Sequence, residues 1–134
     1  MKEQENAQKA QALYAAFGRG DIQTLLSGLT PDVDWTLAGP AEIPLAGQRR
    51  GRDQVAAFFK GVGEMIEFQQ FEPQEFIAQG DKVVVIGHER GRVKATGCAF
   101  DEDWVPVFTL REGKVTKFRE YYDTAAVLAA FRGV

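Results

Sequence analysis

The sequence contains one cysteine and one histidine in 134 residues. A single cysteine excludes an internal disulfide, and zinc sites usually need several Cys or His ligands. Cys98 follows Gly97 with no predicted helix N-terminus beside it to lower its pKa, which favours an inert thiol over a nucleophile. Glycine-rich phosphate loops and nucleophile-elbow motifs are also missing. We therefore expect no cofactor, no metal and a reducing compartment.

The chain also lacks a strong charge of either sign, because 16 basic and 19 acidic residues leave a net charge of −3. Arg49, Arg50 and Arg52 form a local basic cluster, but a solvated loop explains it better than nucleic-acid binding. No stretch approaches the length of a membrane span. The N-terminal segment carries Glu3 and Glu5 and lacks the apolar core of a signal peptide. These absences predict a cytoplasmic protein that binds neither nucleic acid nor membrane.

The length and the 45% hydrophobic content fit one globular domain over residues 1–134. Apolar residues at three- and four-residue spacing predict helices over 5–17 and 52–65, and Asp21 is a good N-cap for a short helix that ends at Gly28 and Pro31. Asp123 and Thr124 can cap a last helix over 125–131. A short strand is expected at 33–37, and the Pro- and Gly-rich residues 38–51 are expected to form a loop.

The second half of the chain has strand composition. The expected strands are separated by glycine-containing turns and cover residues 66–71, 75–79, 82–94, 99–110 and 114–122. Helices first and strands after predict an α+β fold, in which a mainly antiparallel sheet packs against a layer of helices.

Glu120 is the candidate functional carboxylate. It lies on the second arm of a hairpin whose period-two alternation places Thr116, Phe118, Glu120 and Tyr122 on one face, and Val115 on the other. If Phe118 faces the core, Glu120 faces it too. A carboxylate on an apolar face needs a partner or takes a raised pKa, so Glu120 has either a structural or a chemical role.

A second strand suggests partners for Glu120. Along residues 83–92, Val84 and Ile86 share a face with His88 and Arg90, so that face begins apolar and becomes basic. We predict that Arg90 faces inward and pairs with Glu120, either as a structural salt bridge or as part of a catalytic site. His88 is a candidate acid–base group because its ordinary pKa lies near neutrality, although one histidine on a strand is also compatible with a structural or rim position.

Aromatic residues are candidates for the wall of a pocket. Tyr14 and Phe17 lie one helical turn apart, and Trp35 and Trp104 are large enough to enclose a ligand. The alternative for these residues is an ordinary core position.

Four segments make the chain resemble a SnoaL-like protein of the nuclear transport factor two-like superfamily: YAAFGRGD at 14–21, PDVDW at 31–35, GRDQVAAFF at 51–59 and FTLREGKVTKFREYYD at 108–123. The resemblance covers nearly the whole chain. It implies a cone-shaped fold, in which a strongly bent sheet wraps a helix layer around a deep, mostly apolar pocket, often as a homodimer. This fold hosts isomerases, cyclases, epoxide hydrolases and non-enzymatic modules, so it predicts the architecture better than the function.

The functional residues of three such groups match this chain to different extents. The general-base position of ketosteroid isomerases holds Leu37, and their second aspartate falls near Pro106. The arginine and one acid of limonene-epoxide hydrolases match Arg90 and Glu120, whereas the remaining positions hold other residue types: Trp35, Leu37 and Arg92. SnoaL-type polyketide cyclases use a single acid or base in an apolar pocket, which is a lighter requirement.

The resulting hypothesis is an acid–base enzyme acting on a small apolar or cyclic carbonyl or epoxide compound. The predicted catalytic residues are Glu120, Arg90 and His88, and the predicted substrate-binding residues are Tyr14, Phe17, Trp35, Trp104, Phe118 and Tyr122. The alternative is a non-catalytic binding or dimerisation module of the same fold. A homodimer through the convex side of the sheet is expected because the outward residues Val105 and Val107 are apolar.

Overall fold

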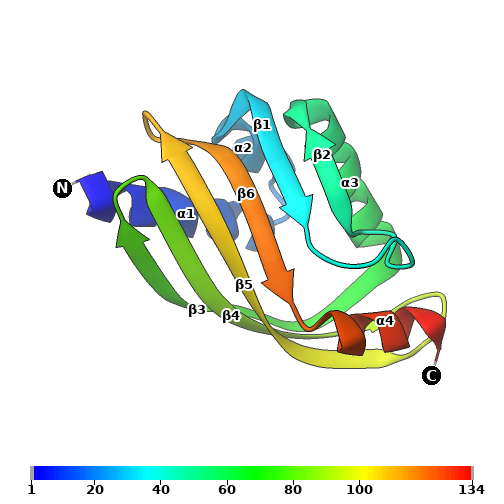
Figure 1. The fold of residues 1–134 in the computed structure, drawn as a ribbon. Coiled ribbons are helices and arrows are strands. Elements are labelled where there is room, and N and C mark those ends of the chain that lie inside the picture. Colours follow the sequence, from blue (N-terminus) through cyan, green and yellow to red (C-terminus); the bar gives the residue numbers. More distant parts are fainter. Residues whose placement is uncertain (1, 134) are drawn as a thin grey trace.

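The computed structural model describes residues 2–133 and begins with helices (Figure 1). The helices are α1 (Lys2–Gly18), α2 (Ile22–Ser27), α3 (Gly51–Met65) and α4 (Thr124–Arg132). Asp21 caps α2 by accepting a hydrogen bond from the Thr24 amide at 3.2 Å, and Asp123 caps α4 by accepting one from the Ala126 amide at 3.0 Å. Both predicted N-caps are confirmed, since each side chain satisfies an amide that has no partner within its helix.

Six strands form one sheet in the order β2-β1-β6-β5-β4-β3. They are β1 (Leu29–Leu37), β2 (Gly47–Arg50), β3 (Ile66–Gln79), β4 (Lys82–Val93), β5 (Ala99–Arg111) and β6 (Lys114–Tyr122). Neighbouring strands are antiparallel except for the parallel pair β1 and β6. The sheet is strongly curved and does not close on itself (Figure 1).

Three strand predictions need correction. β1 begins four residues earlier than expected and contains Pro31. The strand tolerates this proline because its pairing with β6 is irregular between Leu29 and Asp34, so no backbone N–H of residue 31 is needed for a regular hydrogen bond between the strands. Part of the predicted loop pairs with β1 as β2. The two strands expected over 66–79 are one strand. Pro73 lies next to a bulge, where the hydrogen bonding between strands is interrupted and a residue without an N–H is tolerated.

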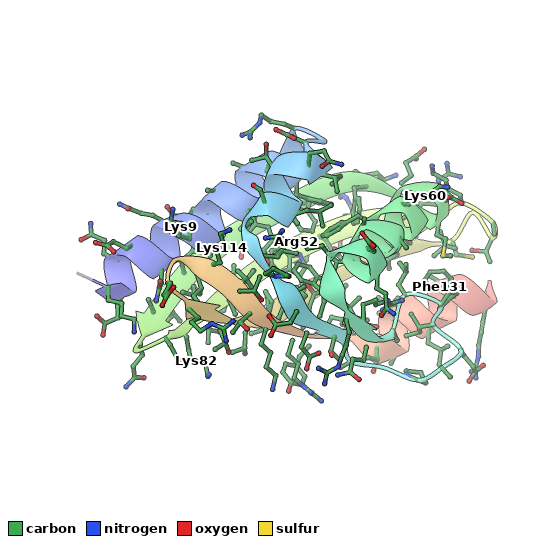
Figure 2. All side chains as sticks on the ribbon, turned by 90° about the horizontal axis from the view of Figure 1, so that it is seen from above. Lys9, Arg52, Lys60, Lys82, Lys114 and Phe131 are labelled. Carbon is green, nitrogen blue, oxygen red and sulfur yellow. The ribbon has the colours of Figure 1, made fainter. Side chains whose placement is uncertain are left out.

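The sheet and the helices together enclose the core, which confirms the α+β fold. Helix α1 packs against β3 and β4, α3 packs against β1, and α4 packs against β5 (Figure 1). Lysines such as Lys9, Lys60, Lys82 and Lys114 are exposed on the outside of the molecule (Figure 2). Within the described residues 2–133, no helix is long and apolar enough to cross a membrane.

The packing of Trp104 on Gly87 defines which face of β4 is inward. The two residues lie directly opposite each other on β5 and β4, and a Cβ atom built on Gly87 would lie 2.3 Å from the indole ring. Val83, Val85 and Gly87 are buried, whereas Ile86 is only partly buried. The inward set of β4 therefore has odd residue numbers, opposite to the prediction.

On β6 the inward set is interrupted. Val115 is fully buried, although the alternation predicted an outward position. The pairing with β5 shifts between Thr109 and Leu110, so Val115 and Phe118 both face inward, three residues apart.

We predict that Gly87→Ala destabilises the fold by about 1–3 kcal/mol, because the added methyl group would overlap the indole of Trp104. Chemical denaturation measures this change. Gly63→Ala is the matched control: Gly63 lies in α3 with nothing within 4 Å of its added Cβ, so this variant should be neutral or more stable. A Gly87→Ala protein as stable as the wild type would show that the indole does not fill this position.

Candidate active site

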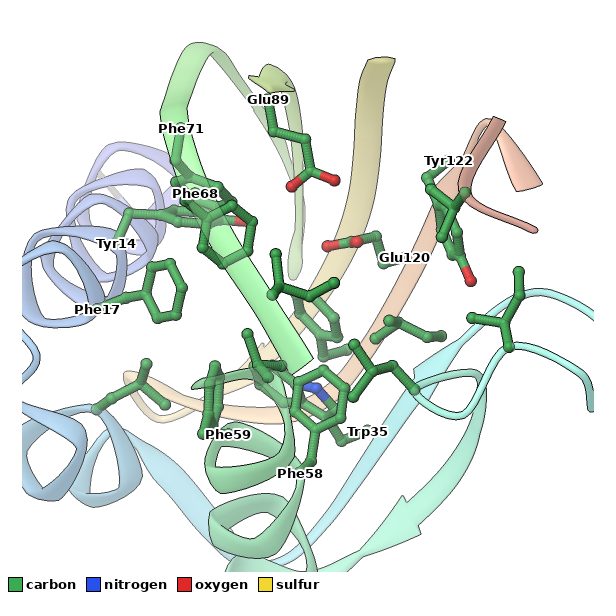
Figure 3. Close-up of a pocket in the computed structure, with 18 of the residues that line it drawn as sticks. Tyr14, Phe17, Trp35, Phe58, Phe59, Phe68, Phe71, Glu89, Glu120 and Tyr122 are labelled. Carbon is green, nitrogen blue, oxygen red and sulfur yellow. The ribbon is translucent and has the colours of Figure 1, made fainter. Parts of the chain in front are cut away.

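A cavity of about 120 Å³ lies between the concave face of the sheet and the helices (Figure 3). Its wall is almost entirely apolar. The lining residues from the helices and from the segment 38–46 are Leu13, Tyr14, Phe17, Leu25, Ile43, Leu45, Phe58, Phe59, Val62, Val127 and Phe131; those from the sheet are Trp35, Leu37, Ile66, Phe68, Phe71, Glu89, Phe100, Phe108, Phe118, Glu120 and Tyr122. The carboxyl groups of Glu89 and Glu120 lie in this apolar wall, where an ionised side chain is unfavourable unless it has a function or a partner.

Stacked aromatic rings support the wall. Trp104 stacks against Tyr14 with ring centroids 5.4 Å apart and against Phe71 at 4.8 Å. Trp35 and Phe118 stack at 3.8 Å with an angle of 9° between their planes. These contacts hold the large side chains in fixed positions around the cavity.

Five of the six predicted binding residues line the cavity: Tyr14, Phe17, Trp35, Phe118 and Tyr122. Their role in binding remains a prediction. The prediction that Trp104 contacts the ligand needs correction. Trp104 is 1% exposed and packs against Tyr14 and Phe71, outside the lining of the cavity.

Glu120 faces the cavity, as the alternation of β6 predicted. It lies between Leu37 of β1 and Pro106 of β5, which are its partners in the sheet. Loss of solvation raises the pKa of Glu120 to about 8, and the negative charge of Glu102 adds to this shift. The Glu120 side chain is partly buried and points toward the cavity (Figure 3). The Glu120 carboxyl can therefore exchange a proton near neutral pH.

Two further glutamates accompany Glu120, and neither was predicted from the sequence. Glu89 of β4 and Glu102 of β5 lie directly opposite each other, and Glu102 is 4% exposed. Loss of solvation raises the pKa of Glu89 to about 11, and the neighbouring Glu102 adds to this shift. Burial also raises the pKa of Glu102, whose Oε1 accepts a hydrogen bond from the Asp123 amide at 2.9 Å. Glu89 and Glu120 both point into the cavity (Figure 3).

Three buried polar groups of the lining have no hydrogen-bond partner among residues 2–133: the hydroxyls of Tyr14 and Tyr122 and the indole nitrogen of Trp35. Burial, followed by the charges of Glu120 and of other glutamates, raises the pKa of both tyrosines. Each hydroxyl therefore keeps its proton and is free to donate. Unpaired buried donors are unfavourable, so their presence in a cavity wall fits a site that binds an oxygen-bearing ligand.

Arg90 does not pair with Glu120. Arg90 is exposed on the convex face of β4, on the other side of the sheet from the Glu120 carboxyl. The prediction was wrong because residues 83–86 are apolar without interruption, so hydrophobicity alone did not show which residues face inward.

His88 lies on the same convex face and is also outside the cavity. Its Nε2 contacts Asp101 at 2.5 Å and its Nδ1 contacts Asp103 at 2.7 Å. The hydrogen bond to Asp103 is the main cause of its raised pKa. His88 therefore belongs to a surface ion cluster on the outside of the sheet.

The sequence contained a signal for Glu89. Gly87 and Gly91 share its parity, and each allows an aromatic ring to lie against β4: Trp104 over Gly87 and Phe100 over Gly91. Glycines two residues to either side of a glutamate indicate close packing on that face.

Arg49 is the arginine beside the aromatic wall. Its guanidinium lies 4.8 Å from the centre of the Phe58 ring and donates to the Leu45 carbonyl at 2.5 Å. Burial lowers the pKa of Arg49. These contacts with Phe58 and Leu45 hold the Arg49 guanidinium in place. No group of three metal-ligating side chains occurs within residues 2–133.

Comparison with known proteins shows to which family this chain belongs. The family model of the SnoaL-like domain matches residues 10–118. The chain belongs to the SnoaL-like family. An uncharacterised protein of Mycobacterium tuberculosis H37Rv is 28% identical over 118 residues, which are 88% of each chain.

Two solved structures show how closely this SnoaL-like fold is shared. An NTF2-like protein from Burkholderia xenovorans LB400 is 44% identical, with a TM-score of 0.89 over 96% of this chain and 97% of that one. TerC, co-crystallised with polyporic acid, is 31% identical, with a TM-score of 0.81 over 96% of this chain and 98% of that one.

We predict that Glu120→Gln makes the protein more stable at pH 8, by up to about 4 kcal/mol, because each unit of pKa shift corresponds to about 1.4 kcal/mol. Below the ordinary pKa of 4.5 both the folded and the unfolded protein carry the proton, so Glu120 has no effect on the pH dependence there. Between about 4.5 and 8 only the unfolded state releases it, and the wild type loses stability as the pH rises.

Denaturation at a series of pH values measures this difference. The stability of the Glu120→Gln protein should depend less on pH in this range, and Glu75→Gln, at an exposed position of β3, should behave like the wild type. A Glu120→Gln protein that is less stable than the wild type at pH 8 would show that a favourable partner holds the carboxylate.

Proposed function

We propose that this SnoaL-like protein is an enzyme that transfers protons to and from a small, largely apolar compound with a carbonyl or hydroxyl oxygen. The observation that carries the proposal is Glu120, a carboxyl group in an apolar cavity whose pKa is raised to about 8. A general base or acid works best when its pKa lies near the working pH. A buried carboxyl with this property is uncommon outside functional sites.

Glu120 is the group that moves the proton in this proposal. Its ionised form removes a proton from a carbon next to the carbonyl group, and the resulting neutral carboxyl returns the proton to a second position on the substrate. Water is excluded by the aromatic wall, which strengthens the electrostatic interactions within the cavity.

In this proposal Tyr14, rather than Arg90, stabilises the negative charge that develops on the substrate. Its buried hydroxyl has no partner within residues 2–133, and the charges of Glu120 and Glu89 both act on it. A neutral hydroxyl that is already in place can donate a hydrogen bond to the oxygen that becomes negative during proton transfer. The indole nitrogen of Trp35 is a second available donor in the wall.

The substrate class follows from the wall and from a relative. Flat aromatic rings cover much of the cavity, which favours an aromatic or cyclic compound. TerC, at 31% identity, was co-crystallised with polyporic acid. Polyporic acid is therefore a suitable first probe for this chain. The second candidate function is binding without catalysis, which the predominance of apolar lining also supports.

We predict that the wild type speeds hydrogen–deuterium exchange next to the carbonyl group of small aryl and cyclic ketones in D₂O, which NMR detects without knowledge of the natural product. Exchange should increase with pH and level off above about pH 8, where Glu120 is ionised. Glu120→Gln should lower the rate by about 10²-fold or more, since an amide does not exchange a proton in this range.

Tryptophan fluorescence with polyporic acid measures binding in the same samples. Glu120→Gln should retain binding, Tyr14→Phe should slow exchange with a smaller effect on binding, and Glu75→Gln should match the wild type. Binding of polyporic acid with no exchange of any ketone would favour the non-catalytic alternative.

We also propose that the protein forms a homodimer through the convex face of the sheet. Val84, Ile86, Val105 and Val107 are partly buried neighbours on β4 and β5, and Tyr121 on β6 is 48% exposed. An apolar outer face on a sheet is typical of an interface. The predicted cytoplasmic location remains a prediction.

We predict a dimer in equilibrium sedimentation at micromolar concentration and a shift toward monomer in Val107→Glu, because burying a charge in the interface is unfavourable. Lys60→Glu changes the charge of an exposed residue of α3, away from this face, and is the control. A monomeric wild type would disprove the proposed dimer.

A further inference from the structure

Glu102 has no direct place in the cavity, yet it lies beside both cavity-facing glutamates. It is opposite Glu89 in the β4–β5 ladder, and its charge raises the pKa of Glu120. It is 4% exposed. Its Oε1 accepts the Asp123 amide, but its buried Oε2 accepts no hydrogen bond from any donor of residues 2–133 while Glu89 is ionised. A proton on Glu89 supplies the missing donor.

We propose that Glu102 is a positioning residue of the acid–base site: it accepts the proton of Glu89 in a hydrogen bond and thereby holds Glu89 as a neutral carboxyl beside Glu120. The proposal deepens the proposed function, because it assigns the charge state of the groups around Glu120. Two carboxyl groups that share one proton form a short, charge-assisted hydrogen bond, whereas two buried carboxylates would repel each other.

The backbone determines which of the two glutamates keeps the proton. The Asp123 amide donates to Glu102 at 2.9 Å, which favours the ionised form of Glu102. No backbone amide of residues 2–133 contributes to the pKa of Glu89, which is raised by burial, then by Glu102 and by Glu120. The proton therefore resides on Glu89.

The charges facing this pair favour a proton within the pair as a whole, because they are all negative. Glu120 on β6 acts on Glu89, and Asp103 and Asp123 act on Glu102; all three are acidic. Tyr14 of α1 and Tyr122 of β6 are neutral at ordinary pH. The ion pairs formed within residues 2–133 join no lysine, arginine or histidine to Glu89, Glu102 or Glu120. Without a cation, only a shared proton reduces the negative charge of the cluster.

This arrangement has a consequence for recognition. Glu89 lies in the cavity wall near Glu120 (Figure 3), so the oxygen of Glu89 that does not carry the proton can act as a hydrogen-bond acceptor there. It suits a substrate hydroxyl or enol group beside the carbonyl that Glu120 acts on. The Glu102 carboxylate also accepts a hydrogen bond from Asp123, the N-cap residue of α4. Because Val127 and Phe131 of α4 line the cavity, this bond connects the Glu89–Glu102 pair to that part of the wall.

Carbon-13 NMR of protein labelled at the glutamate δ-carbon tests the proposal without any substrate. In the wild type, the Glu89 signal should be that of a neutral carboxyl at neutral pH and should remain so while Glu120 titrates. In Glu102→Gln the amide group donates to Glu89 and the neighbouring charge is gone, so the Glu89 titration should move down by about one unit or more. Glu75→Gln should leave it unchanged.

A purely structural role for Glu102 would lower the stability of Glu102→Gln without moving the Glu89 titration. Glu89→Gln provides a second arm, because its amide is a permanent donor to Glu102: this variant should fold as stably as the wild type. An ionised Glu89 in the wild type at neutral pH, or an unchanged Glu89 titration in folded Glu102→Gln, would overturn the proposal. Failure of ketone exchange alone would instead count against the proposed function, since the NMR titration needs no turnover.

Discussion

The position of the buried glutamates on β4 and β5 depends on the contact between Trp104 and the bare backbone of Gly87. Because side chains on a strand alternate, this one contact assigns all of β4 and β5 to a concave or a convex side. Glu89, two residues along from Gly87, is then inside, and so is Glu102, two residues from Trp104. The indole also supports Tyr14 and Phe71, so the contact sets both the shape of the cavity wall and the position of its acids.

The concave face combines carboxyl groups with an environment that does not favour their ionised forms. Loss of solvation raises the pKa of Glu120 to about 8 and that of Glu89 to about 11, so similar side chains differ in their readiness to release a proton. Environments that separate the pKa values of neighbouring acids assign them different roles. In the proposed mechanism Glu120 exchanges the proton, Glu89 retains it, and Glu102 is the carboxylate that accepts a hydrogen bond from the Asp123 amide. The buried acids thus lower the stability of the fold at high pH and make proton transfer available near neutrality.

The two faces of the sheet have different chemistry. The convex face carries exposed charges, including the cluster of His88 with Asp101 and Asp103, next to a partly buried apolar set. The concave face carries aromatic rings, acids and hydroxyls without partners within residues 2–133. Residues adjacent in sequence, such as His88 and Glu89, therefore belong to different environments. Arg90 is on the outside for the same reason, and its place as a donor near Glu120 is taken by Tyr14 in the proposed mechanism.

The sequence by itself determined the helices, the strand content, the N-caps and the inward direction of Glu120, because these depend on local spacing and on a strand whose polar and apolar residues alternate clearly. It also contained the family resemblance, which the match over residues 10–118 confirms. It did not determine the inward face of β4, since Val83 to Ile86 are apolar on both faces, nor the bulge that buries Val115. Only the tertiary structure decided these, because the register between strands and the fit of Trp104 over Gly87 place Glu89 against Glu102. The candidate site therefore arose from contacts between residues distant in the chain, and no local pattern encodes the loss of solvation that gives its acids their properties.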